Sequence, residues 1–193
     1  MEIRLLTDIE YIKTIYRTRL VEDFAANERR PWSSLKKLWK SGRYDCFGLF
    51  DGDELAAYGF FARTKQDGQR LYLLDYLAVS IDRRDQGVGS LFLKMLNDRL
   101  SDADFAVGEV EDPTAAEDKP TWRLRQRRLD FYLRAGYRDT GVTARVYGVD
   151  YRLLEIPTGR EHTAEEIQRY YTAIYESFLP AEFLKQHFKV NAQ

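Results

Sequence analysis

The chain has 193 residues, which is enough for one domain with a sizeable core and short for two. Hydrophobic residues make up 44% and charged residues 32%, a balance typical of a globular chain rather than a disordered one. Thirty Lys and Arg against 31 Asp and Glu give a formal net charge of −1, which argues against bulk binding to nucleic acid or to a membrane surface. An anionic ligand must therefore be held by a local site.

The sequence shows no signal for a membrane or a metal. No stretch approaches the roughly 20 apolar residues that a membrane span needs, and Met1 to Arg4 lacks the features of a signal peptide. Cys46 is the single cysteine and lies in an apolar run, so packing is expected. His162 and His187 are far apart, which argues against a zinc site. We expect a cytoplasmic protein without a metal, whose chemistry uses carboxylates, tyrosines and a bound cofactor.

The N-terminal third is predicted to form a short strand and two helices. Residues 3–6 have strand character, and Thr7 with Glu10 fits a capping box for the first helix. A second helix is expected to start at a cap formed by Ser33 or Ser34.

The middle of the chain predicts strands and one helix. Strands at residues 44–50 and 54–63 flank a hairpin turn at residues 51–53. A strongly apolar strand at residues 71–80 precedes a helix that begins after Gly87.

The second half repeats this alternation. A strand at residues 105–110 and a helix at residues 122–135 are followed by strands at about 138–148 and 149–156. A capping box of Thr163 with Glu166 then precedes a tyrosine-rich helix. This order predicts an α+β fold with a mixed, mainly antiparallel sheet and helices on both faces.

The segment from Leu74 to Ser90 has the chemistry of a phosphate-binding loop. An apolar strand is followed by a charged turn, and Gly87 and Gly89 flank the start of an amphipathic helix. Backbone N–H groups in the first turn of a helix lack internal partners and can donate to a phosphate. The glycines keep side chains out of the way, and Arg83 and Arg84 add charge.

Two glycines alone could equally mark an ordinary strand-to-helix turn. The third glycine of a dinucleotide fingerprint is replaced by Phe92, and no Gly-Lys-Ser/Thr sequence indicates a P-loop.

A family resemblance makes this segment more specific. Arg84-Asp85-Gln86-Gly87-Val88-Gly89 resembles the R/Q-x-x-G-x-G/A motif of the GNAT superfamily, the acyl-CoA-dependent N-acyltransferases. About 45 residues later, the segment from Phe131 to Tyr137 resembles the family's helix-end pattern of Tyr, a short spacer, Gly and an aromatic. One predicted strand separates the two matches. The resemblance covers residues 44–150 well and residues 1–43 less closely.

The resemblance implies a layout for acetyl-CoA. The sheet is expected to splay in a V between its fourth and fifth strands, with pantetheine paired to the strand there and the pyrophosphate resting on the loop amides. The implied cofactor-binding residues are Leu77, Ala78, Val79, Arg84, Asp85, Gln86, Gly87, Val88, Gly89 and Ser90. Residues 1–157 would form the GNAT acetyltransferase domain, and residues 158–193 a helical extension packing on the same domain.

Four residues are candidates for catalysis. Tyr132 falls where the family places the tyrosine that protonates the CoA sulfur, although it could simply pack its helix against the sheet. Asp75 is the first candidate for the general base, because a carboxylate in an apolar strand needs solvent or a partner; a structural carboxylate is the equal alternative. Glu109 and Glu111 are expected to share one strand face, and either could act as base or bind a cationic amine. A backbone N–H near Val79 is expected to stabilise the oxyanion.

Two other segments are ambiguous. Many family members carry an Asn where this chain has Arg125, within an arginine-rich run at residues 123–128. That run could be a solvated helix face, or it could contact the adenosine phosphate or an anionic substrate. The loop at residues 28–32 lies where the family covers its acceptor site, and it could also be an ordinary exposed loop.

We therefore expect an N-acetyltransferase that moves an acetyl group from acetyl-CoA to a primary amine of a small molecule or peptide by direct attack. The alternative is a GNAT-fold acyl-CoA-binding or sensory module with little turnover. A third interpretation, compatible with both, is an interaction protein that forms a homodimer through the tyrosine-rich C-terminal helix. The fold alone does not indicate which amine is the acceptor.

Overall fold

The computed structural model describes residues 1–191, and these form two compact units. Residues 1–63 and 74–99 make up the first unit, and residues 64–73 and 100–191 the second. The last two residues of the expected C-terminal extension lie outside the described range. No helix in residues 1–191 is long and apolar enough to cross a membrane.

The first unit contains the N-terminal helices and the loop that resembles the GNAT motif. Its elements are β1 (Glu2–Leu5), α1 (Ile9–Ile15), the π-helical turn η1 (Tyr16–Leu20), α2 (Val21–Asp23), the 3-10 turn η2 (Ala26–Glu28), α3 (Trp32–Lys40), β2 (Tyr44–Asp51), the 3-10 turn η3 (Ile81–Arg83) and α4 (Val88–Arg99). Two long strands, β3 (Glu54–Gln66) and β4 (Gln69–Val79), run through both units.

The second unit contains the remaining strands and three helices. Its elements are β5 (Phe105–Glu111), the 3-10 turn η4 (Pro113–Ala115), α5 (Lys119–Arg134), β6 (Arg138–Val146), β7 (Val149–Glu155), α6 (Ala164–Glu176), α7 (Ala181–His187) and β8 (Phe188–Asn191).

The strands form a mixed, mainly antiparallel sheet, which confirms the predicted α+β class. In the first unit the order is β1-β2-β3-β4, and in the second the start of β4 is followed by β5, β7, β6 and β8. β4 and β5 are parallel. At the start of this pair, Asp104 N donates to Arg70 O at 3.0 Å.

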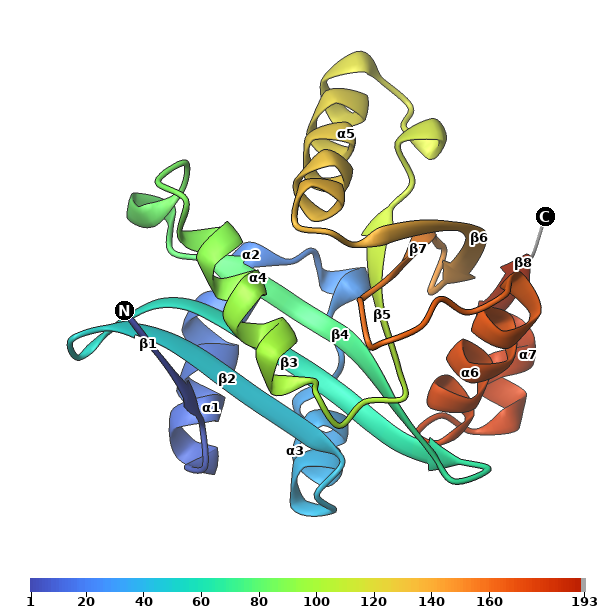
Figure 1. Ribbon diagram of the computed structural model, residues 1–193, viewed down its shortest axis with the longest axis horizontal. Helices are drawn as coiled ribbons and strands as arrows, with labels where there is room; N and C mark the ends of the chain where they lie inside the picture. Colours follow the sequence, from blue (N-terminus) through green and yellow to red (C-terminus); the bar gives the residue numbers. More distant parts are fainter. Residues whose placement is uncertain (192–193) are drawn as a thin grey trace. The chain divides into compact units, whose positions relative to one another are not determined.

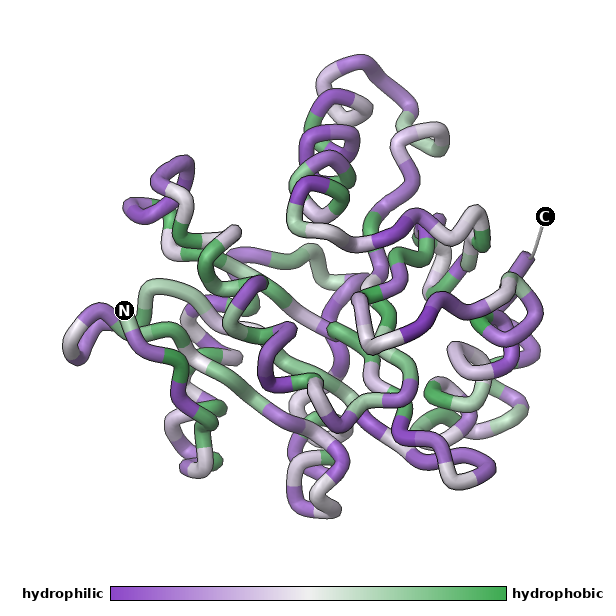
Figure 2. Tube along the Cα trace, in the orientation of Figure 1, coloured by the Kyte–Doolittle hydropathy of each residue, from purple (hydrophilic) through white to green (hydrophobic). Residues whose placement is uncertain are grey.

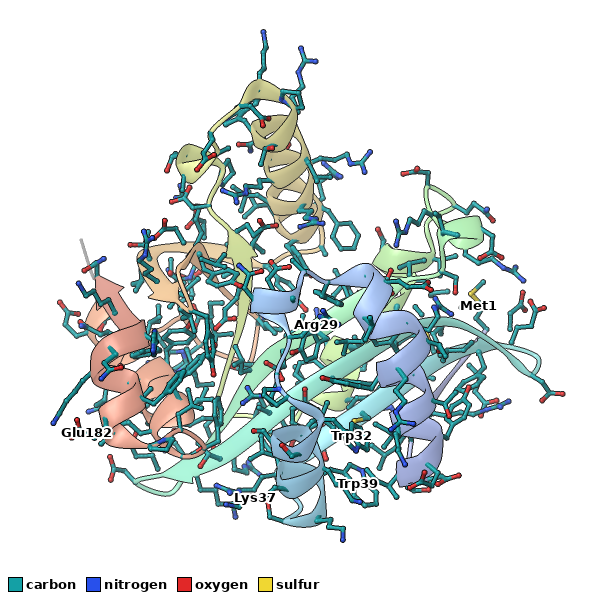
Figure 3. All side chains as sticks on the ribbon, turned by 180° about the vertical axis from the view of Figure 1, so that it is seen from behind. Met1, Arg29, Trp32, Lys37, Trp39 and Glu182 are labelled. Carbon is teal, nitrogen blue, oxygen red and sulfur yellow. The ribbon has the colours of Figure 1, made fainter. Side chains whose placement is uncertain are left out.

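Helices cover both faces of the strands in the first unit. Figures 1 and 3 show α4 on one face of β2, β3 and β4, and α1 and α3 on the other. α4 packs closely because Gly59 has no side chain: a Cβ there would lie 3.0 Å from Leu96 Cδ1. The helix buries a face made up of Val88, Phe92, Leu93 and Leu96.

Cys46 lies in this core, as predicted. It is fully buried on β2, which pairs with β1 on one side and β3 on the other. Burial raises the pKa of its thiol well above the ordinary value.

Two predicted helix caps near the N-terminus are wrong. Asp8, not Thr7, caps α1 and accepts from Glu10 N at 2.9 Å, because its carboxylate takes the orphan N–H of the first turn. α3 begins at Trp32, directly after Pro31, and not at Ser33 or Ser34. Pro31 has the extended ψ of 138° that leads a chain into a helix, so a serine cap is not needed.

Two differences lie further along the chain. α5 starts three residues before the predicted Trp122, because Asp118 caps it by accepting from Thr121 N at 2.7 Å and Pro120 is tolerated in the first turn. The extension, expected to be helical, ends in the strand β8, which pairs with β6. The capping box of Thr163 with Glu166 at the start of α6 is confirmed.

Candidate functional site

The loop that resembles the GNAT motif begins at a firmly held strand end. Ser80 follows β4 and is 8% exposed. Its N–H donates to Ala56 O at 2.8 Å, its hydroxyl donates to Leu55 O at 2.9 Å, and Arg19 donates to the same hydroxyl at 2.9 Å. The strand end is thus fixed before the chain turns toward α4.

Arg83 is tied to the β2–β3 hairpin. Its guanidinium forms ion pairs with Asp51 at 3.0 Å and Glu54 at 2.9 Å. The charge of Arg83 is therefore paired with two carboxylates, and its side chain connects the loop to the hairpin.

Arg84, the first residue of the motif, is also engaged. It pairs with Asp23 at 2.9 Å and donates through Nε to Val79 O at 3.1 Å. Its guanidinium therefore joins the loop to both β4 and α2, and half of its side-chain surface remains exposed.

The backbone then makes a tight turn at Asp85 to Gly87. Asp85 and Gly87 both have positive φ, 59° and 79°, and a Cβ at Gly87 would meet nothing within 4 Å. Gln86 steadies the turn by donating from Nε2 to Asp82 O at 2.7 Å. Figure 2 shows this loop as hydrophilic between a hydrophobic strand and helix.

The first turn of α4 follows directly. Leu91 N donates to Gly87 O at 3.0 Å, so this bond opens the helical ladder. The N–H groups of residues 88–90 precede it and lack acceptors inside α4, as in the first turn of any helix. Together with the open space at Gly87, these N–H groups fit a phosphate.

Asp75 lies in a buried ion pair on β4. Its side chain is 9% exposed and accepts from Arg30 Nε at 3.1 Å and Nη2 at 3.2 Å. Tyr44 OH also donates to it, and burial beside this carboxylate raises the pKa of Tyr44 well above its usual value. These contacts favour the structural alternative for Asp75; its role as base stays a prediction.

The next residue, Tyr76, holds the segment between α2 and α3. Its hydroxyl accepts from Arg30 N at 2.6 Å and contacts Glu28 O at 3.2 Å, the geometry of a donated bond. Burial, with the charge of Asp75 nearby, raises the pKa of Tyr76. Tyr16 OH donates to Arg30 O at 3.0 Å, so this predicted acceptor loop is anchored at several points.

Glu109 lies on β5 in the second unit and contacts α6. The hydroxyls of Tyr171 and Tyr175 donate to its Oε1 at 2.5 and 2.6 Å. Burial and the charge of Glu109 raise the pKa of Tyr171 well above the ordinary value. The tyrosine-rich helix thus supplies partners for a candidate site residue.

Glu111 contacts a different helix, α5. Arg125 pairs with Glu111 Oε1 at 3.0 Å and donates to Asp112 O at 3.2 Å, and Arg128 pairs with Glu111 Oε2. Arg125, which occupies the position of the family's Asn, is 17% exposed and bound to a carboxylate.

Tyr132 lies in an aromatic cluster near the end of α5. Its ring centroid is 5.1 Å from that of Phe131 and 5.4 Å from that of Tyr137. Burial raises the pKa of Tyr132 to about 12, although Arg128 acts in the opposite direction.

The structure thus places the candidate residues in two groups. Leu77, Val79, the motif loop and Asp75 belong to the first unit, and Glu109, Glu111 and Tyr132 to the second. Sequence reasoning missed the partners that hold the carboxylates: Arg30, Tyr44, Arg128, Tyr171 and Tyr175. The tyrosine spacing of α6 indicated one helix face, but not the strand it contacts.

Comparison with solved structures identifies the fold. A Bacteroides thetaiotaomicron protein assigned to the GNAT family of acetyltransferases aligns over 92% of this chain and 98% of its own, with a TM-score of 0.65 and 21% identity. The Escherichia coli ribosomal-protein-S18-alanine N-acetyltransferase aligns over 83% and 96%, with a TM-score of 0.54 and 21% identity. A Bacillus subtilis acetyltransferase in complex with CoA aligns over 80% and 97%, with a TM-score of 0.51 and 15% identity.

These likenesses show that the chain has the fold of the GNAT superfamily. No protein-family model and no curated protein matches its sequence.

Proposed function

We propose that this protein is an N-acetyltransferase that transfers an acetyl group from acetyl-CoA to a primary amine of a small molecule or peptide. The observation that carries the proposal is the junction of β4 and α4, where a fixed strand end leads through a positive-φ glycine loop into a helix N-terminus. The GNAT fold and the acetyltransferases that share it support the same activity.

The proposed donor site lies along β4 and the motif loop. Backbone groups of Leu77 and Val79 pair with pantetheine, and the amides from Arg84 to Ser90 receive the pyrophosphate. Arg84 has an exposed guanidinium beside those amides and is the side chain best placed to add a charged contact.

The acetyl donor supplies an activated carbonyl. The protein must help to remove a proton from the amine and to stabilise the thiolate that leaves. A primary amine with a pKa of about 10.4 must lose a proton before it attacks the carbonyl carbon. The carboxylates of Asp75 and Glu111 are occupied by ion pairs with arginines, whereas Glu109 is held by the uncharged hydroxyls of Tyr171 and Tyr175. We retain Glu109 as the group that receives the proton, directly or through water.

Breaking the C–S bond leaves a thiolate that Tyr132 can stabilise. Complete proton transfer from a phenol with a pKa of about 12 to a thiolate, whose conjugate thiol has a pKa of about 8.5, costs about 5 kcal/mol. We therefore assign Tyr132 a hydrogen bond to the sulfur, with the final proton coming from solvent.

Calorimetric titration with CoA and a thiol-release assay with acetyl-CoA and a panel of amines test the proposal. We expect CoA to bind and thiol release to depend on an amine. Binding without amine-dependent release would support the alternative, an acyl-CoA-binding or sensory module. Failure to bind any CoA thioester would contradict both.

A pair of glycine variants localises the donor site. Gly87→Ala and Gly52→Ala each place a Cβ in open space at positive φ, 79° and 62°, so both carry a similar strain of about 1 kcal/mol. Only Gly87→Ala is expected to weaken CoA binding, by about ten-fold, because only that loop is proposed to hold the pyrophosphate. Equal affinities for the two variants would argue against the loop.

A further inference from the structure

Arg29 is held rigidly by its neighbours on both sides. Tyr76 OH contacts Glu28 O on one side and Arg30 N on the other, at 3.2 and 2.6 Å, so a single buried phenol fixes the backbone around this residue. The guanidinium of Arg30 is already bound to Asp75. Residues of β4 therefore fix the backbone on both sides of Arg29, and none of these bonds involves the Arg29 guanidinium.

One nitrogen of the Arg29 guanidinium, Nε, has an unmet hydrogen-bonding requirement. This atom is shielded from solvent and has no hydrogen-bond partner within residues 1–191. Buried polar groups are nearly always bonded, and a guanidinium offers a planar set of donors that matches a carboxylate. Figure 3 shows Arg29 on the segment that leads to Trp32 and α3.

We propose that Arg29 binds a carboxylate carried by the acceptor, so that the substrate is an amino acid or another amine with a nearby carboxylate. This inference rests on the proposed function. Arg30, the neighbour of Arg29, is bound to Asp75 and Tyr76 of β4, immediately before Leu77, one of the two residues proposed to pair with pantetheine.

The donor does not account for this guanidinium. Its pyrophosphate is assigned to the loop at residues 84–90, beyond the C-terminal end of β4, and an acetyl group carries no charge. With Arg30 neutralised by Asp75, the single guanidinium of Arg29 can form a bidentate pair with one carboxylate.

Matched substrates test the proposal through turnover. With acetyl-CoA fixed, the α-amino acids are compared with their primary amides, which keep the amine and lose the charge. We expect the best amino acid to exceed its amide by at least about ten-fold in kcat/KM, mainly through KM, because a charge-assisted bond contributes about 1.5–3 kcal/mol. Arg29→Gln should abolish the preference and Arg29→Lys should retain part of it.

A control and a second readout keep the result interpretable. Arg17→Gln removes an exposed guanidinium from the same unit and should leave the preference unchanged, and thermal unfolding checks that every variant is folded. Calorimetric binding of the amino acids in the presence of CoA needs no turnover: Arg29→Gln should weaken it by about ten-fold or more.

Three outcomes would overturn the proposal. The first is turnover of spermidine or amides in preference to amino acids. The second is a preference for amino acids over their amides that survives Arg29→Gln. The third is amino-acid binding that is absent, or that is equal in the wild type and Arg29→Gln. The first would leave the acetyltransferase activity itself intact. Loss of CoA binding or of thiol release with every amine would instead contradict the proposed function.

Discussion

The phenol of Tyr132 shows how a residue's surroundings limit its chemistry. Packing between Phe131 and Tyr137 raises its pKa to about 12, so the group is protonated throughout the physiological range. A phenol that stays neutral can donate a hydrogen bond to a developing thiolate at any pH below about 11.

Replacement of Tyr132 by Phe is expected to lower kcat by about 10²-fold and to change the KM for acetyl-CoA little, since the bond forms only as the sulfur gains charge. Steady-state kinetics from pH 7 to pH 10 measure this. Because the phenol titrates near pH 12, the wild type should show no activity loss from Tyr132 within that range.

Tyr11→Phe, at an exposed tyrosine, is the control. A Tyr132→Phe enzyme with full turnover would remove the residue from the mechanism and leave it as a packing side chain.

Asp75 is the residue at which stability and catalysis can be separated. Asp75→Asn leaves the Arg30 guanidinium buried without its counter-charge, and such a loss costs about 3–5 kcal/mol. We expect the free energy of unfolding in urea to fall by that amount. Asp45→Asn breaks a more exposed pair with Arg63 and should cost about 1 kcal/mol or less.

The opposite pattern would identify Asp75 as a base. In that case Asp75→Asn would retain its stability while kcat dropped by about 10²-fold or more.

At the scale of elements, local signals were readable from the sequence. Gly87 and the strand before it predict a turn with positive φ because the requirement lies in the glycine itself. The capping box of Thr163 and Glu166 spans three residues and is likewise visible in the sequence.

Partners that are distant in the chain could not be predicted. Tyr171 and Tyr175 bond to Glu109 across 62 and 66 residues, and Arg30 meets Asp75 across 45. Periodicity places a side chain on a face but does not say what that face will contact. The four-residue β8 was missed because its strand form depends on pairing with β6, a contact that is distant in the chain.

The start of α6 should be sensitive to acid. The bond to Arg160, with the N–H of Thr163, lowers the pKa of Glu166 from 4.5 to about 2. A lowered pKa in the folded protein means that this stabilisation is present above about pH 4.5 and is lost as the pH falls toward 2. Thermal unfolding from pH 6 to pH 2 should therefore show a weaker acid dependence for Glu166→Gln than for the wild type.

Glu176→Gln changes an exposed carboxylate at the other end of α6 and should leave the acid dependence of the wild type in place. Identical pH curves for Glu166→Gln and the wild type would contradict the assignment.

At the scale of the whole molecule, the C-terminal segment belongs to the core of the second unit. α6 buries Tyr170, Tyr171 and Tyr175, and β8 extends the sheet beyond β6. These contacts lie within one chain, so the tyrosine-rich helix does not need a second copy to bury its apolar face.

A chain ending at Gly159 is therefore expected to lose cooperative folding of the second unit and to associate. Loss of α6 would leave apolar strand surface exposed and Glu109 without its two phenols. Sedimentation and thermal unfolding of the short and full chains measure this. A soluble short chain with unchanged stability would show that the segment is dispensable.

The single thiol gives the protein a built-in reporter. Cys46 is fully buried in the middle of β2. Burial raises the pKa of its thiol, so the side chain stays protonated and does not form the reactive thiolate. A thiol-specific reagent can modify it only after the strands around it separate, so the labelling rate should report the opening of the first unit. The second unit contains no cysteine, so the labelling rate reports the opening of the first unit alone and needs no engineered label.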